Sequence, residues 1–405
     1  MINNKLLLTF TIFFLSMIIS VHAQKIKRDL IQYKNIKWTF ETQAPIHGSP
    51  VESEQSIYFG SGDHCIYAVD KASGKLEWKY TTKGPIYSTP FIAGDKLFCT
   101  SLDGNLYALN KSNGKLLWKF LAEQDKQKDI WDYHNGSPLV DEDMVYYGNG
   151  NGNFYAINKD NGKKIWEYKT KAIIHNKPVI DKEKVYFGNF DGVLYALNKE
   201  TGEKIWTFNT IGQKYFPKGA IQQGPTIHNN VVYFGSRDFN MYALNAETGT
   251  GMWNMYETGS WVIATPTIRD SLLLFGTSDT HHFYAMDARN GAVKWKKKIN
   301  INVFGQCETG DKLVYFGALN GKIYAINLLD GKTVWEFQTK ESKDKWDKIF
   351  NAENKFSKKF IEVYGTKPKK FYDEIHSLGS IVSKPLLSNG VLYFTSMNGK
   401  LYAIE

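Results

Sequence analysis

Three histidines in the first half of the chain are the residues best suited to metal or proton chemistry. His47, His134 and His175 each stand three or four residues before a proline, in segments far apart in the sequence. Imidazole is a common metal ligand and exchanges protons near neutral pH. No helical or Cys-x-x-Cys spacing pairs these residues, so we predict no metal site. No Ser–His–Asp order, carboxylate pair or phosphate-binding loop accompanies them, and the sequence therefore favours a non-enzymatic role with no catalytic residues.

The cysteines are few and widely spaced. Cys65, Cys99 and Cys307 form neither a Cys-x-x-Cys motif nor an adjacent pair. Because Cys65 and Cys99 fall in neighbouring repeats, the sequence leaves a disulfide between them open.

The composition is that of a basic globular protein. The chain has 405 residues and a net charge of +9, with lysines scattered through turns rather than gathered in one patch, which argues against a nucleic-acid partner. Lys5, the apolar stretch 6–20 and a small residue at Ala23 predict a secretory signal peptide over 1–23. No lipid-anchor cysteine follows, and no later segment reads as a membrane span. We therefore expect an exported protein, periplasmic or secreted, at most peripheral to the outer membrane.

An eleven-residue phrase recurs along the chain. It has the form Ala-x-Asp/Asn-x-x-x-Gly-x-x-x-Trp, follows a Tyr, and first occurs at 68–78. Seven copies are complete, and an eighth begins at Ala403 and stops at Glu405. The tryptophan missing from the eighth copy is present near the other terminus as Trp38. A repeat divided between the two termini is what a closed ring requires.

Each repeat contains four short strand patterns separated by turns rich in Asp-Gly and Asn-Gly. Eight such repeats predict an all-β protein, an eight-bladed β-propeller of four-stranded blades, closed by pairing the N-terminal strand with the C-terminal blade. The predicted organisation is a signal peptide over 1–23, a linker over 24–35 and the propeller over 36–405. The tryptophans of the phrase are predicted to dock one sheet on the next; they are Trp38, Trp78, Trp118, Trp166, Trp206, Trp253, Trp295 and Trp335.

Three repeats carry extra residues, at 122–134, 211–221 and 341–377. All three insertions lie between a tryptophan strand and the next innermost strand, so they are expected on one face of the ring, where function usually resides. The pattern in 341–377 predicts one amphipathic helix that stops at Gly365, with Pro368 as a break. That helix either buries its aromatic face on the ring or offers a docking surface. The aromatic residues predicted to form partner-binding loops are Trp131, Tyr133, Tyr215, Phe216, Trp346 and Phe350.

The residues just before the innermost-strand prolines are predicted to surround the upper mouth of the central channel. Half of this ring is polar and half is apolar. Such a funnel is able to hold a flat polar ligand, a loop of a partner, or water alone. Its predicted members are His47, Tyr87, His134, Asn135, His175, Gln222 and Phe304.

The repeated phrase resembles the tryptophan-docking repeat of the pyrroloquinoline quinone (PQQ) propeller superfamily, from about residue 36 to 405. One branch comprises PQQ alcohol dehydrogenases, whose propeller holds PQQ and calcium, typically beside an adjacent Cys-Cys pair. This chain has no such pair and is shorter. The other branch comprises BamB-like scaffolds, which are exported and lack catalytic residues. The chain resembles that branch in size and closure, and departs from it by lacking a lipid-anchor cysteine and by carrying the insertion 341–377.

The resemblance and the residues together lead us to expect a monomeric scaffold that binds a protein partner in outer-membrane or envelope protein assembly. This interpretation implies no cofactor and no nucleic acid. Two alternatives remain open: a PQQ-dependent dehydrogenase with PQQ and calcium in the funnel, and a propeller that senses a small ligand.

Overall fold

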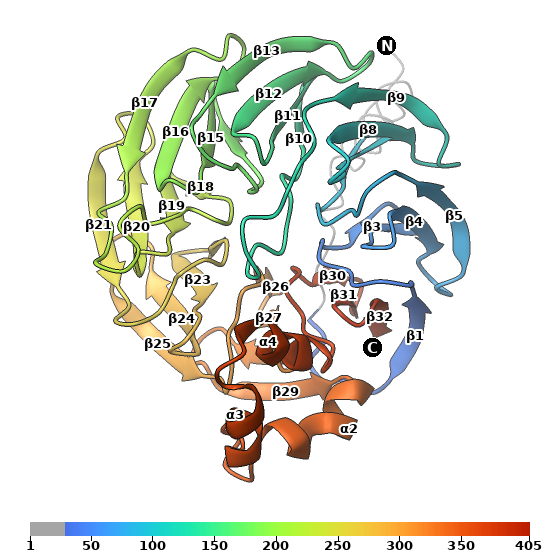
Figure 1. Cartoon of the computed structure of the whole chain (residues 1–405), viewed down its shortest axis with the longest axis vertical. Coiled ribbons are helices and arrows are strands. Elements are labelled where there is room, and N and C mark those ends of the chain that lie inside the picture. Colours follow the sequence, from blue (N-terminus) through green and yellow to red (C-terminus); the bar gives the residue numbers. More distant parts are fainter. Residues whose placement is uncertain (1–28) are drawn as a thin grey trace, which may run out of the picture.

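A computed structural model describes residues 29–405 of the chain. The predicted signal peptide, 1–23, and the first part of the predicted linker lie outside the described residues. Eight four-stranded antiparallel sheets follow one another around a ring (Figure 1). The predicted eight-bladed β-propeller is thereby confirmed. Among residues 29–405, no helix combines the length and the apolar character needed to cross a bilayer.

Blades are numbered here in chain order, and each is given from its innermost to its outermost strand. Blade 1 comprises β2 (Val51–Glu52), β3 (Ser56–Gly60), β4 (Cys65–Asp70) and β5 (Leu76–Thr81), and blade 2 comprises β6 (Phe91–Ala93), β7 (Lys96–Thr100), β8 (Asn105–Asn110) and β9 (Leu116–Leu121). Blade 3 comprises β10 (Leu139–Asp141), β11 (Met144–Gly148), β12 (Asn153–Asn158) and β13 (Lys164–Lys169), and blade 4 comprises β14 (Val179–Asp181), β15 (Lys184–Gly188), β16 (Val193–Asn198) and β17 (Lys204–Asn209). Blade 5 comprises β18 (Thr226–His228), β19 (Val231–Gly235), β20 (Asn240–Asn245) and β21 (Gly251–Tyr256), and blade 6 comprises β22 (Thr267–Arg269), β23 (Leu272–Gly276), β24 (His282–Asp287) and β25 (Val293–Lys298). Blade 7 comprises β26 (Glu308–Thr309), β27 (Leu313–Gly317), β28 (Lys322–Asn327) and β29 (Thr333–Gln338), and blade 8 comprises β30 (Leu386–Ser388), β31 (Val391–Ser396), β32 (Lys400–Ile404) and β1 (Ile36–Glu41).

The hydrophobic core lies between neighbouring blades. The two middle strands of each blade are buried almost throughout, whereas the outermost strands alternate between exposed and half-buried residues. A strand buried on both faces reads as a continuous apolar run, as in the Tyr-Ala phrase, and an edge strand reads as an alternation. The repeat thus encodes the position of each strand within its blade.

The tryptophan of every outermost strand joins its blade to the next one. Each indole Nε1–H donates to a backbone carbonyl over a distance of 2.7–3.2 Å; in seven cases the carbonyl belongs to the adjoining blade, and for Trp335 it belongs to Leu30 of the N-terminal segment. At Trp166 the acceptor is the carbonyl of Lys199, to which the Tyr146 hydroxyl also donates. The donors are Trp38, Trp78, Trp118, Trp166, Trp206, Trp253, Trp295 and Trp335.

The glycine of the repeated phrase is required by the tryptophan of the preceding blade. Gly114 has a φ of +69°, and a Cβ built on it would lie 2.5 Å from the ring of Trp78. Only a residue without a side chain tolerates both the left-handed backbone and this close approach. Six other glycines of the phrase meet a tryptophan ring in the same way.

The chain termini close the ring within blade 8. β1 pairs antiparallel with β32, with Trp38 opposite Ala403 and Phe40 opposite Leu401. This confirms the predicted closure. Because blade 8 is divided between the two chain ends, it lacks the turn whose carbonyl receives the indole of the preceding blade.

Residues 29–35, within the predicted linker, supply that missing contact. The carbonyl of Leu30 accepts a hydrogen bond of 2.7 Å from Trp335. The side chain of Leu30 is buried, and Asp29 accepts from the backbone N–H of Lys312. The N-terminal segment therefore packs on blade 7 in place of the absent turn.

The long insertion forms three short helices: α2 (Lys340–Ile349), α3 (Lys358–Tyr364) and α4 (Pro368–His376). The prediction of one amphipathic helix is wrong. The helical run breaks after Phe350, where Asn354 adopts a φ of +57°, and Ser357 caps a new helix. α3 ends at Gly365 as predicted, but Pro368 starts α4 because its missing N–H and fixed φ suit a first helical turn.

The aromatic side chains of the insertion fold back onto one another and onto the ring. Phe350 and Phe360 are buried, and Phe356 stacks between them at 5.4 and 5.7 Å between ring centroids.

Cys65, Cys99 and Cys307 are buried and free, so Cys65 and Cys99 form no disulfide in this structure.

Candidate functional site

A loop from the first insertion covers the centre of the propeller on the face that carries the helices (Figure 1). We call residues 125–134 of this loop, between β9 and β10, the plug. Three of its side chains, those of Asp125, Asp132 and Tyr133, are buried. The partners of Asp125, Asp132 and Tyr133 come from blades 1 and 4 and from α4, and Asp129 of the plug pairs with Arg237 of blade 5, so the plug connects several blades across the channel.

The first anchor of the plug is His175, in the segment before β14. Its Nδ1 lies 2.8 Å from the Asp132 carboxylate and its Nε2 lies 3.0 Å from the Asp125 carboxylate. Burial alone would lower the pKa of this imidazole, but the two carboxylates outweigh burial and raise the pKa to about 10. His175 is therefore a buried cation held between two anions, and both of its N–H groups donate to the plug.

The second anchor is Arg237, in the turn between β19 and β20. Its guanidinium binds the Asp129 carboxylate through two bonds of 2.6 and 3.1 Å. It also donates to the side-chain oxygen of Gln222, and its Cζ lies 4.6 Å from the centroid of the Trp261 ring. A planar guanidinium is suited to pairing with a carboxylate and stacking on an indole at the same time.

Two neutral histidines form the third anchor. His47 donates from Nδ1 to the Tyr133 carbonyl at 2.5 Å and stacks on Tyr87 at 4.0 Å. His134 bonds through Nε2 to the His47 carbonyl at 3.1 Å, and its Nδ1 accepts from Gln223 at 2.9 Å. Burial lowers the pKa of His47 to about 3 and that of His134 to about 4. Both rings are thus uncharged at neutral pH and serve as hydrogen-bonding groups.

The predicted funnel residues do surround the channel, but most of their polar groups bond to protein. Gln222 donates to the Trp131 carbonyl, and the Asn135 side chain bonds to the Tyr87 N–H and the Thr100 hydroxyl. Phe304 lies 5.8 Å from the ring of Tyr133. The structure brings together the whole predicted set, namely His47, Tyr87, His134, Asn135, His175, Gln222 and Phe304.

Sequence reasoning missed the charged partners of this network. These are Asp125, Asp129 and Asp132 in the plug and Arg237 in blade 5. Two signals were present: three aspartates recur within the first insertion, and Arg237 is one of only four arginines in a lysine-rich chain. Neither signal identifies which blade supplies the partner.

The residues predicted to form partner-binding loops divide into buried and exposed sets. Tyr133 and Phe350 are buried inside the plug and the helical insertion, at 3% and 1% exposure. Trp131, Phe216 and Trp346 are half-buried, and Tyr215 is 71% exposed. The half-buried and exposed residues are therefore able to contact a partner directly, whereas Tyr133 and Phe350 support the surface from beneath.

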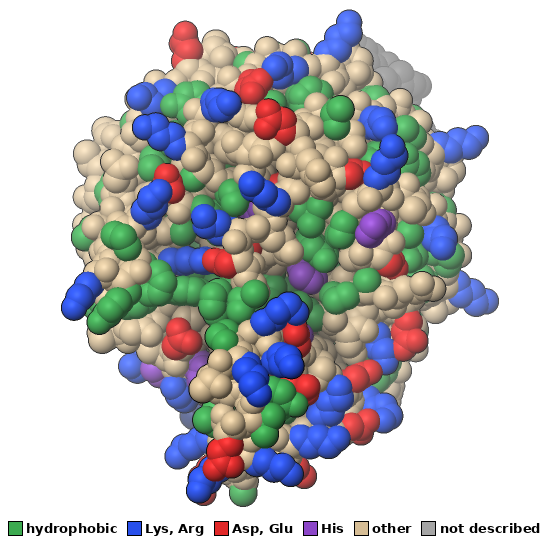
Figure 2. All heavy atoms as spheres, in the orientation of Figure 1, with side chains coloured by type: hydrophobic (Ala, Val, Ile, Leu, Met, Phe, Trp, Pro, Cys, Tyr) green, Lys and Arg blue, Asp and Glu red, His purple; other side chains and the backbone are tan. Residues whose placement is uncertain are grey.

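Aromatic rings form a continuous row across the same face. From blade 5 inward, neighbouring centroids are 6.0, 5.7, 5.2, 5.4 and 5.7 Å apart, and the row ends on α4. Figure 2 shows hydrophobic side chains gathered in a band that crosses this face. We call this set the aromatic row; it consists of Tyr256, Phe239, Phe216, Trp261, Trp131 and Tyr372.

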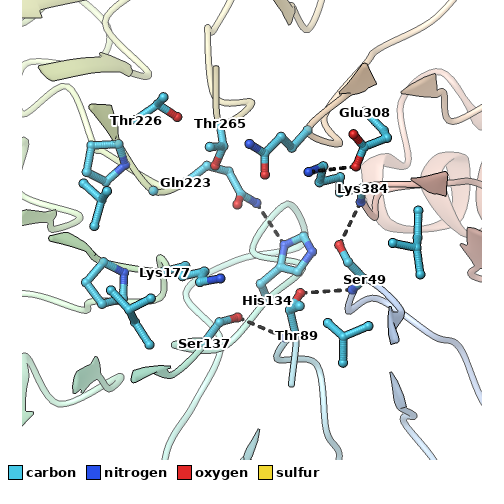
Figure 3. Close-up of a pocket in the computed structure, with 18 of the residues that line it drawn as sticks. Ser49, Thr89, His134, Ser137, Lys177, Gln223, Thr226, Thr265, Glu308 and Lys384 are labelled. Carbon is cyan, nitrogen blue, oxygen red and sulfur yellow. Dashed lines mark hydrogen bonds and ion pairs between the residues drawn. The ribbon is translucent and has the colours of Figure 1, made fainter. Parts of the chain in front are cut away.

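A cavity of about 690 Å³ lies in the channel beneath the plug (Figure 3). His134 and Phe304 are among its lining residues, so the plug closes one end of it. The lysines Lys177 and Lys384 point into the cavity, and Lys384 pairs with Glu308 at 3.0 Å. Burial lowers the pKa of Lys177 to about 8, with Lys384 adding to the effect.

The residues present do not fit a calcium-dependent quinone. Calcium requires several oxygen ligands, usually including carboxylates. The carboxylates that line the cavity are Glu52, Asp141 and Glu308, and each pairs with a lysine. Within 29–405, no group of three or more His, Cys, Asp or Glu residues is arranged to hold a metal ion. In the predicted funnel, His47, His175 and Gln222 already bond to residues of the plug.

Comparison with known proteins gives a family and several similar folds. The model of the family described as outer membrane protein assembly factor BamB matches residues 34–194, 123–254 and 190–348. The crystal structure of BamB from Moraxella catarrhalis is similar over 92% of this chain and 97% of its own, with a TM-score of 0.66 and 16% identity. No curated protein matches the sequence at a significant level.

Two quinoproteins are similar to a comparable degree. A europium-containing methanol dehydrogenase covers 94% of both chains, with a TM-score of 0.68 and 13% identity. A quinohemoprotein alcohol dehydrogenase from Comamonas testosteroni covers 91% of this chain and 76% of its own, with a TM-score of 0.66 and 12% identity. Identities this low establish the fold alone. The family model covers most of the chain, and the protein therefore belongs to the BamB-like family of PQQ-like repeat propellers.

Proposed function

We propose that this protein is an exported, non-enzymatic scaffold of the cell envelope that binds a protein partner during the assembly of outer-membrane proteins. The observation that carries the proposal is the family match over residues 34–348, whose description names that assembly process. The signal peptide predicted over 1–23 supports export.

The closed channel supports a platform rather than a reaction chamber. The plug occupies the mouth of the channel on the face that carries the insertions, and it is fixed by His175, Arg237 and His47. A ligand entering from this face would have to break those bonds. Recognition on this side therefore falls to the outer surface of the inserted loops.

The aromatic row is the docking surface that we assign to the partner. Aromatic side chains lose little conformational entropy on binding and dominate protein interfaces. Tyr256, at the outer end of the row, is 51% exposed, and Ile211 and Tyr215, in the loop that carries Phe216, are 69% and 71% exposed. The buried anchors of the plug hold the row rigid, which lowers the entropic cost of association.

Site-specific photocrosslinking in intact cells tests the proposal. A photoreactive amino acid at Tyr215 should crosslink to a component of the outer-membrane assembly machinery. The matched control is Leu329, which is 88% exposed in the turn between β28 and β29 on the opposite face. Equal crosslinking from the two positions, or capture at Tyr215 of proteins unrelated to the outer membrane, would overturn the assignment.

A pair of surface variants adds a quantitative readout. The double substitution Ile211→Ser and Tyr215→Ser removes exposed apolar area and leaves the plug intact. It should reduce partner capture by about tenfold, because exposed aromatic anchors at interfaces are each worth roughly 1–2 kcal/mol. Leu329→Ser should leave capture unchanged.

The enzymatic alternative has its own test. Titration of the mature protein with PQQ and calcium, followed by the absorbance of the quinone and by dye-linked alcohol oxidation, should show neither stoichiometric binding nor turnover. Binding together with turnover would contradict the scaffold proposal.

A further inference from the structure

The cavity beneath the plug is a blind pocket. Innermost strands such as β10 start near the insert face and run towards the opposite face. The lining residues follow β2 from Ser49 to Glu52 and β10 from Ser137 to Asp141. Since His134 of the plug closes the pocket at the insert face, access is from the opposite face. The pocket is thus separate from the docking surface proposed above.

One residue from every blade contributes to the wall of the pocket. It is the residue immediately before the innermost-strand proline, or before Cys307 in blade 7. Six of these residues are small or neutral, and the two charged ones are lysines. The full set is Ser49, Thr89, Ser137, Lys177, Gly224, Thr265, Gln306 and Lys384.

The two lysines come from opposite sides of the ring. Lys177 precedes β14 in blade 4 and Lys384 precedes β30 in blade 8, four blades away. Both side chains point into the pocket (Figure 3). An anion between them would be contacted from both walls of the channel.

One lysine of the pocket, Lys177, differs from the other charged residues that line it. The three carboxylates of the pocket are each paired with a lysine, as described above, and Lys384 is one of those lysines. In the described part of the chain, no carboxylate forms an ion pair with Lys177. The ammonium group of Lys177 lies 5.0 Å from the centroid of the Phe91 ring.

This charge is costly in an enclosed site. The side chain of Lys177 is exposed to the pocket interior but surrounded by channel walls, and burial followed by repulsion from Lys384 lowers its pKa to about 8. The group is still mostly protonated at neutral pH. A bound anion would relieve both effects, because it would supply the opposite charge that is missing.

The neutral residues of the ring complete a polar lining. The hydroxyl oxygens of Ser49, Thr89 and Ser137 accept backbone N–H groups from neighbouring blades at 2.8–3.0 Å, which leaves their own O–H groups to donate. Hydroxyl donors beside ammonium groups suit the oxygens of an acidic ligand.

We propose that this pocket binds a small organic anion, with a carboxylate or phosphate group held between Lys177 and Lys384. The site goes beyond the proposed scaffold function and does not depend on it. One register of the repeat contributes a residue from every blade to the wall of the pocket, and in that register only blades 4 and 8 carry charged residues.

Calorimetric titration of the mature protein at low ionic strength tests this site, with succinate, citrate and inorganic phosphate as probes. At least one probe should bind with a stoichiometry of one. Lys177→Met should weaken that binding by about tenfold or more, the typical worth of a charged hydrogen bond. Lys177→Arg, which keeps the charge, should retain it within a few-fold. The ranking of the probes distinguishes a carboxylate ligand from a phosphate ligand.

The control is Lys332→Met, which removes an 82% exposed lysine from a turn in blade 7. It should leave binding unchanged. Failure of all three probes to bind the unaltered protein, or equal binding by Lys177→Met, would overturn the proposal. A thermal melt of each variant without ligand establishes that the propeller is intact.

The pH dependence provides a second readout. Affinity should fall as the pH rises through about 8, where free Lys177 loses its proton. The other charged and titratable groups that line the pocket are Lys384, Glu308, Glu52, Asp141, His175 and His134. His134 is already neutral there, because burial lowers its pKa to about 4. Affinity independent of pH between 7 and 9 would exclude Lys177 as the anion ligand.

Discussion

Replacing His175 by Gln should release the plug while leaving the propeller folded. The substitution removes the cation between Asp125 and Asp132, whose side chains are 5% and 1% exposed. Removing one partner from a buried ion pair typically costs about 3–5 kcal/mol, because a charge is left without compensation. The plug is an inserted loop that belongs to none of the eight sheets, so this cost should appear as local opening rather than global unfolding.

Native-state amide hydrogen exchange measures that opening directly. A loss of about 3–5 kcal/mol corresponds to an opening constant that is roughly a hundred to several thousand times larger. Amides in 125–134 should exchange faster by that factor in His175→Gln, and amides in β12 and β16 should not change. His228→Gln, at the end of β18 and outside the plug contacts, is the matched control.

A second substitution separates charge from shape. If uncompensated carboxylates cause the opening, then adding Asp132→Asn to His175→Gln should recover a large part of the protection, because one of the two orphaned charges is removed. Exchange in 125–134 within about threefold of the unaltered protein in His175→Gln would refute the reasoning. So would an added loss of protection in the double variant.

Three further predictions concern the ring and its pH response. Gly114→Ala should lower the free energy of urea unfolding by about 1–3 kcal/mol more than Gly94→Ala, since both glycines have positive φ but only Gly114 meets an indole ring. Leu30→Ala should cost about 2 kcal/mol or more in the same assay and its neighbour Ile31→Ala less than about 0.5 kcal/mol, because the first side chain is buried and the second is 67% exposed. The pKa of His175 is raised from 6.5 to about 10 on folding, so the stability it contributes is full below pH 6.5 and is lost as the pH rises towards 10. Calorimetric melting temperatures should therefore fall more over that range in the unaltered protein than in His175→Gln.

The sequence predicted the architecture because the repeat states each structural requirement locally. Gly114 and its equivalents mark a turn and a ring contact, and the tryptophan four residues later marks the outermost strand. The closure was predictable because Trp38 is the one member of the set found apart from its phrase. These signals act over short distances in the chain, and their repetition removes ambiguity.

The helical insertion was predicted less well because it occurs once. Its apolar spacing continues across the break after Phe350, where the backbone leaves the helix and Asn354 turns with a positive φ. The sequence predicts a break at Pro368, although proline is equally compatible with the first turn of a helix. Nothing in a single copy indicates which of the two roles applies.

The site was predicted by position but not by partner. The structure places His47 and His175 in segments that lead into the innermost strands, because each has a fixed offset from a proline. The groups that bond to these residues are far away in the sequence: Tyr133 lies 86 residues from His47, and Asp129 lies 108 from Arg237. Lys177 gives no sequence signal of its own, because a single lysine in a lysine-rich chain does not indicate that it faces a channel.

The divided eighth blade makes closure of the ring depend on one long-range pairing. β1 and β32 lie at opposite ends of the propeller sequence, yet they must pair with each other for the circle to exist. Without β32, the facing edges of β1 and β31 are both unpaired, and Trp38 loses the strand that holds it against blade 1. The pairing of β1 with β32 encloses the other seven blades in a single loop, so it carries a larger loop-closure entropy than any hairpin within a blade. We therefore expect closure of blade 8 to be the slowest pairing step when the propeller folds.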